Sequence, residues 1–150
     1  PSTVETSTSP EAKPTDGWGS SAMLYAFVEG LAGVQDKDKL FRRVRICPKW
    51  INAGIEKAEV KIDYKSSGAF VKYHYSHTAD RLTLNLSGSY EYIQLSLPVP
   101  GNYTAGDLMI CGKKKKYIMA TINQSNYLIA DADVKGDCEI VLSLKKKPLT

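Results

Sequence analysis

The side chains that could carry out acid–base or metal chemistry are few and scattered. The two histidines, His74 and His77, lie near one predicted hairpin and lack the H-E-x-x-H or H-x-H spacing of a metal site. Glycosidase chemistry needs two carboxyl groups about 5 to 9 Å apart, and the sequence singles out no such pair. It also contains no phosphate-binding loop, dinucleotide glycine motif or G-x-S-x-G elbow. We therefore predict no catalytic residue, no metal ligand and no cofactor in this chain.

The three cysteines are too few and too widely spaced for a disulfide framework. They are Cys47, Cys111 and Cys138, and no two of them form a C-x-x-C pair. At most one disulfide could form. Each cysteine adjoins apolar residues typical of strands, so we predict that each is a small buried hydrophobic residue.

The aromatic residues offer a binding surface in place of catalytic groups. Nine tyrosines and two tryptophans are present, and Tyr73 with Tyr75, like Tyr90 with Tyr92, is spaced to point to one face of a strand. An aromatic ring matches the apolar face of a sugar, so Tyr73 and Tyr75 are candidate substrate-binding residues. Packing of aromatic side chains between neighbouring strands is the alternative interpretation.

The positive charge is local. The formal net charge is +4, and most of the excess comes from two lysine runs, residues 113–116 and 145–147. Such runs are typical of solvated turns or protected strand edges, whereas a nucleic-acid binder spreads basic residues along one face. We therefore predict no nucleic-acid partner. No apolar stretch is long enough for a membrane span.

The first third of the chain predicts an arm, a helix and a loop. Residues 1–16 are rich in Ser, Thr, Pro and Glu, which indicates an extended arm or linker. Within residues 17–38 we predict a helix over 20–32, capped by Ser20 or Ser21 and ended by Gly33, and then a connecting loop. Its apolar stripe consists of Met23, Leu24, Phe27, Val28 and Leu31.

Residues 39–150 predict a β-sandwich. Apolar residues alternate with polar ones through the segment, as in Val44 and Ile46 against Arg43 and Arg45, and Gly, Ser, Asn or Asp separates the runs. The pattern predicts about eight to nine antiparallel strands. Gly112 and the lysines after it predict the tip of a hairpin. The predicted class is therefore mainly β, with one amphipathic helix in front.

One segment of the sequence resembles a known family. The stretch from Gly17 to Trp50 is similar to a segment near the C-terminus of glycoside hydrolases with an α/α six-barrel, especially α-L-rhamnosidase-like enzymes. In that family a W-G/S-S sequence opens the last barrel helix, and a strand F-x-x-V-x-I-x-P begins a β-sandwich. The matching residues are Trp18, Gly19, Ser20, Ser21, Glu29, Gly30, Leu31, Gly33, Phe41, Val44, Ile46 and Pro48. The later stretch from Leu95 to Lys113 is similar in pattern.

The resemblance implies a role. The parent protein would be a glycoside hydrolase, whose catalytic carboxylates lie in a barrel upstream of this chain, and this chain would be a C-terminal accessory domain that packs on that barrel. Pro1 in place of Met at the start fits a fragment of a longer protein, and it fits a processed mature protein equally well. Trp18 would either lie near the sugar pocket or pack against the N-terminus of the helix. A secreted or periplasmic location would follow. The alternative is a carbohydrate-binding or surface-adhesion module that uses the paired tyrosines and the lysine hairpin.

Overall fold

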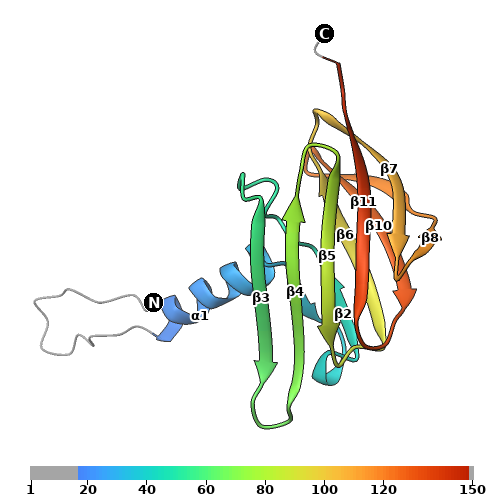
Figure 1. The fold of residues 1–150 in the computed structure, drawn as a ribbon. Coiled ribbons are helices and arrows are strands. Elements are labelled where there is room, and N and C mark those ends of the chain that lie inside the picture. Colours follow the sequence, from blue (N-terminus) through green and yellow to red (C-terminus); the bar gives the residue numbers. More distant parts are fainter. Residues whose placement is uncertain (1–16, 149–150) are drawn as a thin grey trace, which may run out of the picture.

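The computed structural model describes residues 17–148, which form two facing sheets and one helix (Figure 1). The helical segments are α1 (Gly17–Tyr25), the π-helical turn η1 (Ala26–Leu31) and the 3₁₀ turn η2 (Lys39–Phe41). The strands are β1 (Val34–Asp36), β2 (Arg43–Ile46), β3 (Lys57–Tyr64), β4 (Ala69–His77), β5 (Arg81–Gly88), β6 (Tyr92–Val99), β7 (Tyr103–Ile110), β8 (Lys113–Lys115), β9 (Ile118–Ile122), β10 (Ser125–Asp133) and β11 (Cys138–Lys146). The arm predicted for residues 1–16 lies outside the described residues.

The prediction of a mainly β sandwich is confirmed. One sheet has the strand order β1-β2-β6-β10-β9, and the other has the order β3-β4-β5-β11-β7-β8. The described residues form eleven strands, two more than the nine at the top of the predicted range. The pairing is antiparallel except between β2 and β6, which run parallel. Strand β1 belongs to the segment that was predicted as a helix and loop.

The apolar side chains of the alternating pattern fill the space between the two sheets. On β5, Leu82, Leu84 and Leu86 point inward and are almost fully buried. Ile140 on β11 lies opposite Leu84, so the six-stranded sheet presents a continuous apolar surface to the other sheet. Alternate residues of β6 meet this surface from the five-stranded sheet. The alternation of apolar and polar residues along each strand therefore identifies the core residues from the sequence alone.

The lysine hairpin differs from its prediction. Cys111 and Gly112 form its tip, and both have positive φ, 49° and 73°. This is the backbone that a two-residue turn with right-handed strand twist requires. The lysines that follow form β8, which pairs with β7, and β9 then crosses to the other sheet. The hairpin partner is therefore the lysine run itself and not the apolar strand beyond it.

The helix projects from one edge of the sandwich (Figure 1). It begins at Gly17, so Ser20 and Ser21 lie within α1 and the predicted cap at these residues is wrong. It ends as predicted, since Gly33 adopts a φ of +69°. None of the helices within residues 17–148 is long and apolar enough to span a membrane.

Candidate functional site

A buried hydrogen-bond network fixes the base of the helix to the sandwich. The hydroxyl of Tyr73 on β4 donates to the carbonyl oxygen of Ala32 at 2.7 Å and accepts from the Trp50 indole nitrogen at 2.8 Å. Tyr73 is completely buried, and burial raises the pKa of its hydroxyl far above the usual value. The hydroxyl therefore stays protonated and joins three segments: the end of the helix, β4 and the turn after β2.

The chain after the helix also pairs closely with the chain after β2. The Gly33 carbonyl accepts from the Cys47 amide at 2.7 Å, and the Leu31 carbonyl accepts from the Lys49 amide at 3.0 Å. In addition, the Gln35 side chain donates to the Glu29 carboxylate at 2.7 Å. These bonds extend the β1–β2 ladder to the last helical turn, so the helix leaves the sheet in a defined direction.

The helix held in this way presents apolar side chains to solvent. Leu24, Tyr25 and Phe27 are 66%, 62% and 52% exposed. Scattered exposed apolar residues are ordinary, but three within four positions on one projecting helix form a patch that is typical of an interaction surface. We call Leu24, Tyr25 and Phe27 the helix patch.

The candidate substrate-binding tyrosines lie in the core. Tyr73 and Tyr75 are 0% and 2% exposed. They do share one face of β4, as the spacing predicts, but that face packs against the other sheet: Tyr73 lies beside Leu86 and Tyr75 beside Leu84 on the neighbouring strand. A sugar-stacking platform needs an exposed ring face, and neither residue has one. The Trp18 side chain lies outside the described part of the chain.

The two tyrosines of the second pair, Tyr90 and Tyr92, lie in different surroundings. Tyr90 is buried before β6, and its hydroxyl donates to the Gly136 carbonyl at 2.6 Å. Burial raises the pKa of Tyr90 to about 12. Tyr92 lies partly exposed on β6, and its hydroxyl donates to the Asp131 carboxylate. Tyr92 is therefore the member of this pair that remains at the surface.

The two histidines lie in the last four residues of β4, and their surroundings differ. His74 is exposed and lies 3.8 Å from a Glu59 oxygen. His77 packs edge-on to Tyr103, with 6.1 Å between the ring centroids. Within residues 17–148, no three His, Cys, Asp or Glu side chains are grouped so that they could hold a metal ion.

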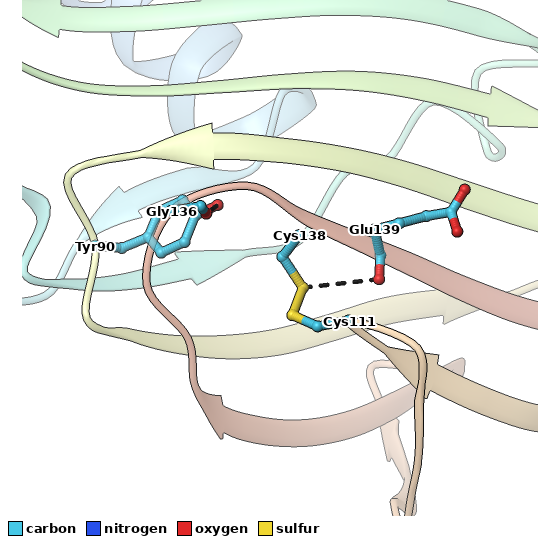
Figure 2. The surroundings of a disulfide bond; sticks show 5 residues. All are labelled: Tyr90, Cys111, Gly136, Cys138 and Glu139. Atoms are coloured by element: carbon cyan, nitrogen blue, oxygen red, sulfur yellow. Dashed lines mark hydrogen bonds between the residues drawn. A yellow bond between two sulfur atoms is a disulfide. The ribbon is translucent and has the colours of Figure 1, made fainter.

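Two of the three cysteines form a disulfide, which corrects their interpretation as separate buried residues. Cys111 in the β7–β8 turn bonds to Cys138 at the start of β11 (Figure 2). The β7–β11 ladder places Ile110 opposite Ile140, and the Cys111 amide then donates to the Glu139 carbonyl at 2.8 Å, so Cys111 lies beside the residue next to Cys138. The spacing along the sequence does not reveal this pairing. Cys47 is free and buried, as predicted.

Tyr73 and Tyr75 give a matched pair of stability tests. Tyr73→Phe leaves a buried carbonyl and an indole N–H without their partner, so it should lower the free energy of unfolding by about 2 kcal/mol. The Tyr75 hydroxyl is buried and has no hydrogen-bond partner among the described residues, so Tyr75→Phe should be neutral or should stabilise by about 1 kcal/mol. Urea unfolding of both variants measures the difference. A larger loss for Tyr75→Phe would contradict the assignment of the anchor to Tyr73.

Comparison with known proteins gives a likeness in fold. No protein-family model and no curated protein matches the chain. Among solved structures, the chain is similar to an α-L-rhamnosidase from Dictyoglumus thermophilum, with a TM-score of 0.51 and 7% sequence identity. The match covers 91% of this chain and 15% of that one, so the chain spans a small part of that enzyme's length. At this identity the likeness concerns the fold alone: the chain resembles one domain-sized part of a rhamnosidase.

Proposed function

We propose that this chain is a non-catalytic accessory domain of a glycoside hydrolase. It packs on a catalytic α/α barrel of the same parent chain through the helix patch. The observation that carries the proposal is the combination of an exposed apolar patch with an anchored base: Leu24, Tyr25 and Phe27 face solvent, while the Tyr73 network holds the helix to the sandwich. A helix that is fixed at one end and carries an exposed apolar patch is suited to pack against a neighbouring helical domain.

Two further observations support this proposal. Burial of a large apolar side chain contributes roughly 1.5–3 kcal/mol, so covering the three side chains of the helix patch can contribute several kcal/mol to domain packing. The fold similarity takes in most of this chain but only 15% of the rhamnosidase, which is the relation expected of one domain in a larger enzyme. The resemblance of residues 17–50 to the last barrel helix and the first sandwich strand agrees with it.

The Cys111–Cys138 bond supports the secreted or periplasmic location that the family resemblance implies. Disulfides form and persist in oxidising compartments and are rare in the cytosol of most organisms. We include this location in the proposal.

The helix patch is tested by Leu24→Asp in two settings. In the isolated chain the variant should change the free energy of unfolding by less than about 0.5 kcal/mol, because Leu24 is 66% exposed. In the full-length parent protein it should destabilise the domain pair by about 2–4 kcal/mol, because a charge replaces a buried apolar group. Thermal unfolding of both proteins measures the two effects.

Ile118→Asp is the matched control. Ile118 is also 66% exposed but lies on β9, at the opposite edge of the five-stranded sheet from β1. We expect it to change the isolated chain and the parent protein equally. If Leu24→Asp left the parent protein's stability and activity unchanged, the accessory-domain proposal would be rejected.

A further inference from the structure

A row of polar side chains crosses four strands on the outer face of the five-stranded sheet. The strand register places Gln35 beside Arg45, Arg45 beside Gln94, and Gln94 beside Asp131. The residues next to them on each strand, such as Val44 on β2, point into the core, so the four polar side chains share the opposite face. Adjacent strands lie about 4.8 Å apart, so the row extends roughly 14 Å, the length of a short oligosaccharide.

Neighbouring side chains hold parts of this row in place. The Arg43 guanidinium lies over the Tyr92 ring, 4.6 Å from its centroid, and the Tyr92 hydroxyl donates to Asp131. Arg45 donates to the hydroxyl of Ser96 at 3.4 Å. The groups are thus tied together across β2, β6 and β10. Ordering before a ligand arrives lowers the entropy cost of binding.

The surface along the row is hollowed at three places. The first hollow is lined by Gln35, Arg45 and Lys49 together with Tyr25 and Glu29 from the helical segment. The second is lined by Lys37, Arg43, Tyr92 and Gln94. The third is lined by Gln94, Asp131, Lys116, Tyr117, Ile118 and Ile129. Gln94 belongs to the second and third hollows, and Arg43 and Arg45 lie two residues apart on β2, so the hollows follow one another along the row.

The charge of these hollows is unbalanced. The cations that line them are Lys37, Arg43, Arg45, Lys49 and Lys116, whereas the acids are Glu29 and Asp131. None of these five cations forms an ion pair with a carboxylate of residues 17–148. The lysines of β8, by comparison, include Lys114 paired with Asp107. The hollows along the row therefore carry positive charge that lacks a carboxylate partner in the described part of the chain.

We propose that this polar row binds an acidic oligosaccharide, one that contains uronic acid units. A guanidinium forms two parallel hydrogen bonds to a carboxylate, and Arg43 and Arg45 present two such groups on one strand. The amides of Gln35 and Gln94 can hydrogen-bond sugar hydroxyls, and the ring of Tyr117 can pack on sugar C–H faces. The carboxylates of Asp131 and Glu29 can accept hydrogen bonds from sugar hydroxyls.

This function goes beyond docking to a barrel and does not depend on it. The helix patch faces a partner domain in the proposed function, whereas the polar row uses the outer face of the sheet. Leu24→Asp should therefore leave oligosaccharide binding unchanged, and failure of either proposal can be told from failure of the other.

Calorimetric titration of the chain with hexagalacturonate tests the proposal, with maltohexaose as the neutral sugar and a single-stranded DNA oligonucleotide as the other polyanion. We expect saturable binding of hexagalacturonate and none of maltohexaose. Arg43→Gln with Arg45→Gln should weaken binding at least roughly tenfold, because it removes two charge-assisted hydrogen-bond donors to the ligand carboxylates. Gln94→Ala, at an exposed position, is a second and milder variant that should weaken binding several-fold.

Lys113→Gln with Lys115→Gln is the matched control, since it removes the same charge from exposed residues of the other sheet. It should change affinity by less than about twofold. Equal losses in the two double variants would mean unspecific attraction and would overturn the proposal. Absence of hexagalacturonate binding would also overturn it, and so would equally tight DNA binding through the same two arginines.

Discussion

Replacing Gly33 with alanine is expected to destabilise the domain by roughly 3–5 kcal/mol, a very large effect for one methyl group. A Cβ on Gly33 would lie 1.8 Å from the carbonyl oxygen of Cys47 and 2.1 Å from its carbon. These are backbone atoms, so no side-chain rotation can relieve the clash. The residue also has a φ of +69°, which disfavours any residue with a Cβ. Helix and sheet must separate at this point to admit the methyl group.

Gly54→Ala separates the two causes. Gly54 has the same φ of +69°, but no atom lies within 4 Å of the Cβ position. Gly54→Ala should therefore lower the free energy of unfolding by about 1 kcal/mol, which is the cost of the positive φ alone. Urea unfolding of the two variants gives the comparison. If both lost the same stability, the close approach of Gly33 to Cys47 would not be what fixes the helix.

The sequence predicts the fold because local rules agree along most of the chain. Alternation marks the inward residues of β5, β6 and β11, and Gly33 marks the end of the helix. The same rules do not say which face of a strand lies inside when both faces carry large side chains. On β4, Tyr73 and Tyr75 alternate with Lys72 and His74, and only the packed sheets show that the tyrosine face is the buried one.

The polar row could be predicted only in part. Alternation places Arg43 and Arg45 on the outer side of their strand, where they are easily read as solvated charges. Gln94 lies 49 residues beyond Arg45 in the sequence, yet the parallel pairing of β2 with β6 puts the two side by side. Such a register is set by long-range packing, which a single sequence does not reveal.

The disulfide accounts for the other large effect that we expect. Reducing Cys111–Cys138 should lower the free energy of unfolding by about 3.5 kcal/mol, since the bond closes a loop with a sequence separation of 27 residues. That is a large fraction of the 5–15 kcal/mol by which ordinary domains are stable. The closed loop contains β8, which belongs to the six-stranded sheet, and β9 and β10, which belong to the other. The bond therefore restricts the unfolded chain in a segment that must reach both sheets.

Urea titrations with and without a reducing agent measure this contribution, and a Cys111→Ser, Cys138→Ser variant supplies the control. The variant should unfold at the midpoint of the reduced protein, and reductant should not shift it further, because Cys47 is unbonded. Hydrogen exchange should show the earliest loss of protection at the β7–β8 turn, where Cys111 is held at a φ of 49°. A native protein that contains the disulfide but unfolds at the same urea concentration after reduction would show that the strand ladder alone fixes this turn.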